Sequence, residues 1–232
     1  MKLLRVTGLA ALALLFSTLA TTSAFADQLR IDYATGNTHY GGGAFFVDNV
    51  VGGPLAGTTF NTFCLEEHEF FTPGNTYIYS ISDRAVQGGV GPAGDPISLG
   101  TAYLYNKYLD DGANYNGSDQ QALQEAIWFL EDEITSCTGS CASVLNAAKI
   151  ALGTPGTPLT DQQIKANCTD SNQCYGVVAL NLTDSNNNLV QDQLGRVPEA
   201  GATLLLSMGL AGLAWFARRK NLLPSGVRPL NV

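Results

Sequence analysis

Two apolar segments, one near each end of the chain, confine a globular fold to the residues between them. At the start, Lys2 and Arg5 precede an apolar run over 9–19, and Ala24-Phe25-Ala26 supplies the small residues that a signal peptidase recognises. This layout is typical of a secretory signal and is too short for a membrane-spanning helix. We therefore expect a signal peptide over 1–26, cleaved after Ala26, and an exported protein.

The second apolar segment covers 200–217 and is followed at once by Arg218, Arg219 and Lys220. About eighteen apolar residues closed by a basic cluster are long enough to cross a bilayer with the charges kept inside. We expect a transmembrane helix and its basic cluster within 197–220, and a short tail over 221–232. Taken alone, this pattern also fits an ordinary C-terminal membrane anchor.

One domain is expected over 27–196, a length sufficient to bury a core. The formal net charge of the whole chain is −8, and this domain is more acidic still because both end segments carry basic residues. Such a surface does not hold nucleic acid through its phosphates, although an acidic face favours targets that carry amines.

The first half of the domain has the pattern of strands. Alternating, β-branched and aromatic stretches occur over 29–33, 44–47, 58–65 and 76–81, and a Gly/Pro-rich loop over 88–96 ends this section. A further strand is expected over 176–180, with a last one after the turn at 184–188.

Helices are expected between these two groups of strands. One covers about 99–109, a second opens at Ser118 with the spacing of a capping box, a third covers about 142–152, and a short one follows Thr160. The second helix places Leu123, Ala126, Ile127, Leu130 and Ile134 on one stripe. The order of elements predicts an α+β fold in which a helical subdomain is inserted into a sheet.

Four of the five cysteines, Cys137, Cys141, Cys168 and Cys174, lie close together in the sequence. In an exported protein they are expected to form disulfides, and local pairing of Cys137 with Cys141 and Cys168 with Cys174 is the favoured arrangement. Crossed pairing and a tetrathiolate zinc site are the alternatives.

Cys64 is left over, and an unpaired thiol in an exported chain is either reactive or waiting for a partner. Gln124 follows about sixty residues later on the second predicted helix. A thiolate is a strong nucleophile and a primary amide is a poor electrophile, so only close placement by the fold would let the two react. Loss of ammonia would leave a thioester that acylates amines and hydroxyls, and Trp128 could shield it from water.

The run Glu66-Glu67-His68-Glu69 follows Cys64 directly. In a strand only alternate members share a face, and the helical His-Glu-x-x-His spacing is missing, so we predict no metal site and no cofactor. His68 is a candidate base that deprotonates Cys64. A hydrolase that uses Cys64 with His68 is a further alternative, although the sequence offers no oxyanion signal.

Two motifs around these residues resemble the thioester (TQXA-type) domains of bacterial surface adhesins. Phe63-Cys64-Leu65 matches their aromatic-Cys-aliphatic motif, and the run from Leu123 to Trp128 matches their hydrophobic-Gln-x-Ala-Ile-Trp motif, with Leu123 where Thr is typical. The resemblance covers about 58–134. It implies that Cys64 and Gln124 form the thioester pair, and that the sheet is β-sandwich-like with a helical subdomain.

The C-terminal order of a short motif, an apolar helix and a basic cluster resembles the PEP-CTERM sorting signals that exosortases process in Gram-negative bacteria. The short motif is Val197-Pro198-Glu199-Ala200, with Ala200-Gly201 where Pro-Ser is most common. The resemblance implies transient membrane anchoring, processing near Pro198 by an exosortase-type enzyme, and delivery to the cell surface or extracellular matrix.

Three hypotheses for function follow. The first is an exported adhesin that bonds once, through its thioester, to a polysaccharide or protein target and does not turn over as an enzyme. The second is a structural extracellular-matrix protein without a reactive bond, and the third is the Cys-dependent hydrolase.

Overall fold

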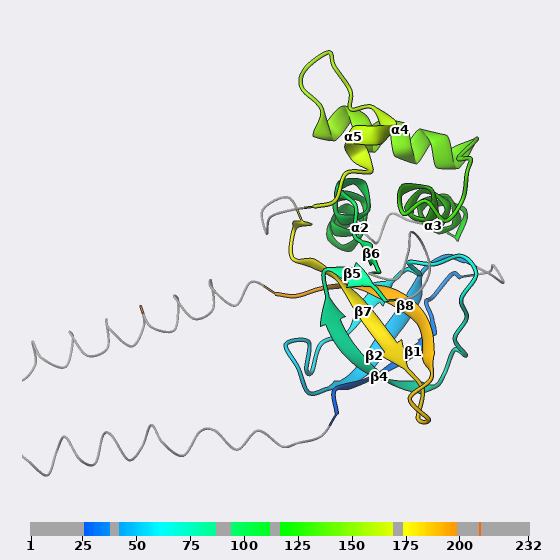
Figure 1. Cartoon of the computed structure of the whole chain (residues 1–232), viewed down its shortest axis with the longest axis vertical. Helices are drawn as coiled ribbons and strands as arrows, with labels where there is room; N and C mark the ends of the chain where they lie inside the picture. Colours follow the sequence, from blue (N-terminus) through cyan, green and yellow to red (C-terminus); the bar gives the residue numbers. More distant parts are fainter. Residues whose placement is uncertain are drawn as a thin grey trace, which may run out of the picture.

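Strands, helices and again strands follow one another along the chain. The computed structural model describes residues 26–37, 42–86, 94–111, 117–168, 174–198 and 209. The strands from both ends of this order join into one sheet, and the helices between them stand over one end of it (Figure 1). The α+β class and the helical insertion expected from the sequence are confirmed.

The main sheet has six antiparallel strands in the order β3-β2-β1-β4-β7-β8. Their bounds are β1 Gln28–Tyr33, β2 Phe45–Val51, β3 Phe60–Thr62, β4 Thr76–Ser82, β7 Val177–Thr183 and β8 Leu189–Arg196. A separate two-stranded ribbon pairs β5 Arg84–Ala85 with β6 Asp95–Pro96. This ribbon lies partly in the segment that the sequence predicts to be loop.

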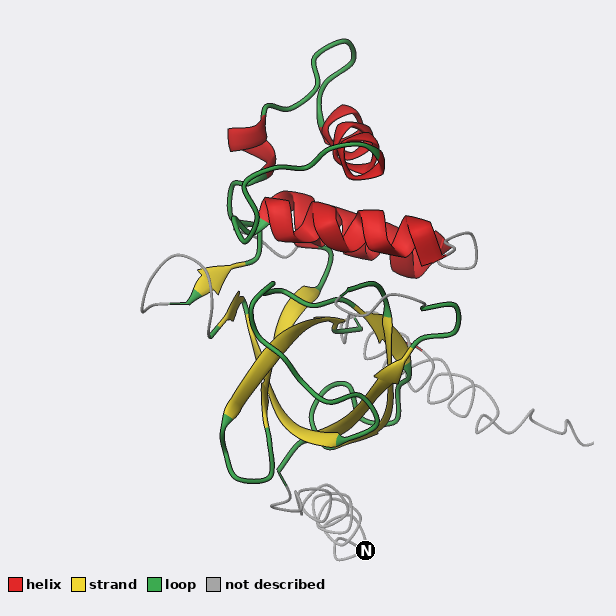
Figure 2. Ribbon diagram, turned by 90° about the vertical axis from the view of Figure 1, so that its right-hand side faces the viewer, coloured by secondary structure: helices red, strands yellow, loops and turns green. Residues whose placement is uncertain are grey.

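The six-stranded sheet curls until its two edge strands meet (Figure 2). Residues 63–65, which continue β3, hydrogen-bond to β8: Leu65 N donates to Asp192 O at 3.0 Å, and Leu194 N donates to Phe63 O at 3.0 Å. The β-sandwich-like arrangement implied by the resemblance is therefore not what the structure shows: one sheet curls until its edges join, in place of two sheets packed face to face. Register shifts in β1 and β7 increase the local twist that lets the sheet close.

The helices are α2 Leu99–Asp111, α3 Gly117–Leu130, α4 Ser140–Leu152 and α5 Asp161–Ile164. In Figure 1, α2 and α3 lie next to the sheet, with α4 and α5 beyond them. The side chain of Ser118, where the sequence predicts a capping box, lies outside the described residues. A capping box is present at α5 instead, where Thr160 accepts a hydrogen bond from Gln163 N and the Gln163 side chain accepts one from Thr160 N.

Two clusters of buried side chains make up the core. The helix-side cluster joins α2, α3 and α4 to the end of the sheet and includes Phe63, Leu65, Leu123 and Ile127. The sheet-interior cluster fills the space inside the curled sheet and includes Cys64 and Trp128. The predicted stripe of α3 is buried from Leu123 to Leu130, whereas Ile134 lies beyond the helix end and is half-buried.

The targeting segments fall almost wholly outside the described residues. This applies to 1–25, to Glu199 and Ala200, and to the predicted span, basic cluster and tail over 201–232 apart from Gly209. Within the ranges that the structure describes, no helix is long and apolar enough to cross a membrane.

Candidate functional site

Cys64 lies where the two edges of the curled sheet join. It forms an antiparallel bridge with Gln193 on β8, between the hydrogen bonds made by its two neighbours. Because successive side chains in extended chain point to opposite faces, Phe63 and Leu65 enter the helix-side cluster and Cys64 enters the sheet interior. Cys64 is 2% exposed and is the one cysteine outside a disulfide.

Gln124 reaches Cys64 from the middle of α3. Its Nε2 donates to Cys64 O at 2.8 Å, and its Oε1 accepts a hydrogen bond from Cys64 N at 3.0 Å. Gln124 is fully buried, so these contacts satisfy an amide that would otherwise be costly to remove from water. The fold thus joins the two residues that the sequence singles out, across sixty positions of chain.

These hydrogen bonds fix the orientation of the Gln124 carboxamide against the Cys64 backbone. A backbone N–H that donates to a carbonyl oxygen stabilises the negative charge which develops on that oxygen as a tetrahedral adduct forms. Here the donor is the amide of Cys64 itself. The site therefore places an oxyanion donor on the same residue that carries the thiol.

Gln193 supplies the polar contact of the thiol. Its Nε2 lies 3.4 Å from Cys64 Sγ, and the side chain is fully buried. Burial raises the pKa of Cys64 to about 12, the Gln193 hydrogen bond opposes that rise, and the charge of Glu66 adds to it. At neutral pH the thiol is protonated, so its proton has to leave during any reaction with an acyl group.

Trp128 lies one turn beyond Gln124 and is 6% exposed. Residue 42 passes close to both side chains: a Cβ at Gly42 would lie 3.3 Å from Gln124 Cγ and 3.3 Å from the Trp128 ring. A larger residue at position 42 would therefore press on the pair. Trp128 and this close-packed segment limit the access of water to Gln124.

His68 does not join the site. Its side chain is 84% exposed, and Nε2 lies 3.5 Å from Glu67 Oε2 on the surface. The polar partner of the Cys64 thiol is Gln193, so a role of His68 as the base gains no support from its position. Among the described residues, no group of His, Cys, Asp and Glu side chains is arranged to hold a metal ion.

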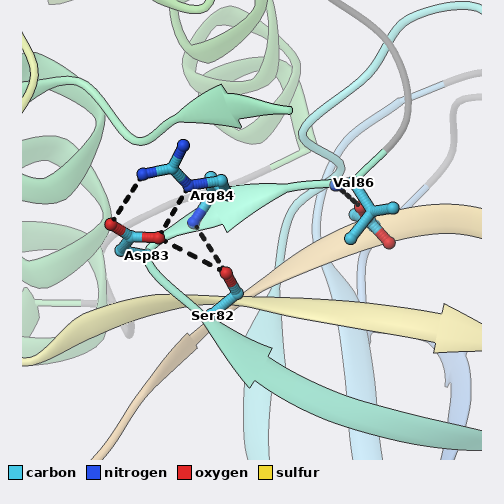
Figure 3. Close-up of polar contacts among 5 residues, drawn as sticks. Ser82, Asp83, Arg84 and Val86 are labelled. Carbon is cyan, nitrogen blue, oxygen red and sulfur yellow. Dashed lines mark hydrogen bonds and ion pairs between the residues drawn. The ribbon is translucent and has the colours of Figure 1, made fainter. Parts of the chain in front are cut away.

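Glu66 and Asp192 form a buried acidic pair beside Cys64. Glu66 Oε2 accepts from Asp192 N at 3.0 Å, and burial, with the charge of Asp192 next in importance, raises the pKa of Glu66 to about 10. Asp192 Oδ2 accepts a hydrogen bond from Val86 N at 2.7 Å. Figure 3 shows Val86 at the end of β5. At the start of this strand, Arg84 forms an ion pair with Asp83. The acidic pair ties β5, β8 and the Cys64 segment together.

Both disulfides follow the local arrangement favoured by the sequence. Cys137 is bonded to Cys141, and Cys168 is bonded to Cys174. Each bridge closes a short loop at the margin of the helical subdomain, which leaves Cys64 as the free thiol.

The predicted processing residues lie at the limits of the described chain. Ala26 is exposed at the start, and Val197 and Pro198 follow β8 at the end, where Val197 N donates to Gly176 O at 2.9 Å. Pro198 is exposed. The remaining two residues of the motif, Glu199 and Ala200, lie outside the described residues.

Gln193 and Gly42 were not indicated by the sequence analysis. Gln191, Asp192 and Gln193 read as a polar run, yet all three are buried because β8 closes the curled sheet and faces the Cys64 segment. The signal that could have pointed to Gln193 is the unbroken polar run over 191–193 within a strand.

Comparison with protein-family models, with characterised proteins and with solved structures gives no match.

Proposed function

We propose that this protein is an exported adhesin in which Cys64 and Gln124 form an internal thioester that bonds covalently to a target. The observation that carries the proposal is the pair of hydrogen bonds, at 2.8 and 3.0 Å, between the fully buried Gln124 carboxamide and the backbone of Cys64. Many backbone groups could satisfy the hydrogen-bonding capacity of a buried glutamine, yet here both partners belong to the free cysteine.

Thioester formation needs no cofactor. The Cys64 sulfur attacks Cδ of Gln124, the carbon–nitrogen bond of the carboxamide breaks, and the thiol proton leaves with the NH₂ group as ammonia. Cys64 N stabilises the oxygen of the tetrahedral adduct, and Gln193 Nε2 stabilises charge on the sulfur while the proton is transferred. Placement by the rigid fold supplies the effective concentration that a poor electrophile requires.

The product stores acylating power for a single use. An amine or hydroxyl of a polysaccharide or protein target would take the Gln124 acyl group and release the Cys64 thiol, after which the protein stays attached. This is self-catalysed acyl transfer without turnover. Burial of Cys64 and Trp128 would protect the bond from water until a nucleophile reaches it.

Export and surface delivery form the second part of the proposal. We infer that the chain is secreted through 1–26, held in the membrane through the apolar segment, and processed near Pro198 by an exosortase-type enzyme. The exposed position of Pro198 and the two disulfides are compatible with this route.

Uptake of methylamine tests the thioester. Native protein incubated with methylamine should carry a γ-glutamyl methylamide at residue 124, and the Cys64 thiol should become reactive toward a maleimide in the same proportion. The variant Cys64→Ala should carry no methylamide. The control is protein that has not been treated with any amine and is then unfolded. If Cys64 in this sample reacts with maleimide and Gln124 is intact, the proposal is refuted.

The deep burial of Cys64 favours one other candidate function. A thiol whose pKa is raised to about 12 is chemically inert, as expected of a structural extracellular-matrix protein without a reactive bond. In that case the unfolded protein yields a plain thiol and methylamine changes nothing. The hydrolase hypothesis has no comparable support, because His68 lies exposed on the surface.

A further inference from the structure

A pocket lies where β3, the end of β8 and the last turn of α2 meet. Its volume is about 640 Å³, within the range of roughly 300–1,000 Å³ that is typical of small-molecule sites. Neither Cys64 nor Gln124 belongs to its lining. The pocket is therefore separate from the proposed thioester, whose formation makes no use of it.

One wall of the pocket is an aromatic ring on the outer face of the sheet. In β2, Phe45 and Val47 belong to the sheet-interior cluster, so Phe46 between them points outward and is 36% exposed. Phe46 pairs with Asn61 of β3, and side chains directly opposite one another on neighbouring strands share a face. The register thus sets a flat apolar surface beside a carboxamide, and both line the pocket.

The Asn61 carboxamide is held in place by α2. Its Nδ2 donates to the hydroxyl of the buried Tyr108 at 2.9 Å. The Tyr105 hydroxyl, one turn earlier, donates to Asn61 O at 2.8 Å and so fixes the backbone of the same residue. A carboxamide anchored through its nitrogen still has its oxygen as an acceptor. The exposed Thr59 adds a hydroxyl to the lining, and a hydroxyl can both donate and accept.

The charged residues of the lining balance one another. Arg196 and Asp110 are the one cation and the one anion among the described lining residues, and Arg196 Nη1 lies 2.7 Å from Asp110 Oδ1. Arg196 Nη1 also donates to Asn106 Oδ1 at 2.7 Å. Both bonds use the same nitrogen, so they leave the Nε and Nη2 hydrogens for other acceptors. The pocket offers donors and acceptors without a net charge, and a charged ligand would gain little from it.

We propose that this pocket binds a neutral oligosaccharide of pyranose rings, without a covalent bond. A pyranose carries C–H groups on its ring faces and hydroxyls around its rim, which suits an aromatic surface surrounded by polar groups. Phe46 would pack against a ring face, and Asn61 and Arg196 would hydrogen-bond to hydroxyls. An apolar partner would bury these polar side chains without giving them partners, which is costly. The inference goes beyond the thioester and holds whether or not Cys64 reacts.

Saturation-transfer NMR on the full-length variant Cys64→Ala tests this inference, because that variant cannot form the thioester. The probes are two neutral tetrasaccharides, cellotetraose and maltotetraose, and the anionic tetragalacturonate. We expect at least one neutral probe to bind, and Phe46→Ala to weaken its binding about fivefold or more. Phe70→Ala is the matched control, because its ring is 76% exposed and lies outside this pocket, and it should leave binding unchanged.

Asp110→Asn tests the charge balance. Asp110 is 54% exposed, and its loss removes the anion that pairs with Arg196. This variant should bind tetragalacturonate about threefold more tightly than the parent, and added salt should reduce the gain.

Two sets of results would overturn the proposal. The site is refuted if neither neutral probe binds, or if Phe46→Ala and Phe70→Ala bind them equally well. The neutral class is refuted if the parent prefers tetragalacturonate to both neutral probes, or if Asp110→Asn gains no affinity for it. The thioester is absent from every protein used, so its own failure would be seen only in the methylamine experiment.

Discussion

Gln193 Nε2 lies 3.4 Å from Cys64 Sγ, across the bridge that closes the curled sheet. In the proposed reaction, this contact supplies a donor that stabilises negative charge on the sulfur. Replacement of Gln193 by Met keeps a similar volume and removes this donor. The neighbouring Thr62 hydroxyl is not left without an acceptor in this variant, because it still donates to Leu194 O at 2.7 Å. We expect Gln193→Met to slow thioester formation by roughly three- to tenfold.

The experiment starts from unfolded protein in which Cys64 and Gln124 are intact. After refolding, the loss of ammonia is followed over time by mass spectrometry. Gln191→Met is the matched control, because Gln191 lies on the same strand and is buried but donates to Glu66 O instead of the thiol. Equal slowing in both variants would assign the Gln193 effect to strand packing.

Trp128 is predicted to protect the thioester from water. Trp128→Ala removes a side chain that is 6% exposed and lies one turn beyond Gln124, so spontaneous hydrolysis to Glu at position 124 should become several times faster. The variant should also lose about 3 kcal/mol of unfolding free energy from the cavity. Trp128→Phe should keep most of the protection, and hydrolysis of Trp128→Ala at the wild-type rate would contradict the shielding role.

Stability should fall as pH rises from 5 to 8. Burial raises the pKa of Glu131 from 4.5 to about 7, so the folded protein binds a proton that the unfolded chain has already released. Its stabilising contribution is complete below the unfolded pKa and is lost as pH rises through the folded pKa. The loss from this group is on the order of 3 kcal/mol.

Chemical denaturation at several pH values measures this slope. Glu131→Gln keeps an oxygen that can accept from Ser98 N, and should make the decline between pH 5 and 8 smaller, while the buried Glu66 still contributes to it. Glu125→Gln, half-buried on α3, which ends one residue before Glu131, is the control and should leave the slope in place. A wild-type protein that gains stability over this interval would contradict the burial argument.

Removal of the Cys168–Cys174 disulfide should lower stability without affecting the thioester. The bridge spans a sequence separation of 6, and closing a loop of this size contributes about 2 kcal/mol in the chain-entropy model. Cys168→Ser/Cys174→Ser should therefore denature earlier and still react with methylamine at residue 124. Loss of that reaction in folded variant protein would mean that the helical subdomain controls the site more directly than its contacts indicate.

Local sequence pattern was sufficient for the helices and for the strands of the main sheet, and it singled out Cys64 and Gln124 as a candidate pair. The stripe from Leu123 to Leu130 predicts α3 because apolar spacing decides which face of a helix is buried. Alternation predicts the strands around Cys64 in the same way. Cys64 and Gln124 could be paired because two motifs resemble those of thioester domains, and the fold does bring the residues into contact.

The remaining features depend on long-range pairing, which no local pattern records. Closure of the sheet joins residues 63–65 to β8, and this pairing buries Gln193 beside the thiol. The β5–β6 ribbon involves Pro96, which a sequence argument assigns to loop. His68 follows Cys64 closely in sequence, yet its side chain lies in solvent.

The mass of the native protein is the most direct test of the central claim, the Cys64–Gln124 thioester. We predict that the peptides containing residues 64 and 124 remain linked and together lack one ammonia, once both disulfides are accounted for. Cys64→Ala and Gln124→Ala should each abolish the link. Full mass with separate, unmodified peptides in freshly purified protein would contradict the account and leave a structural role for this domain.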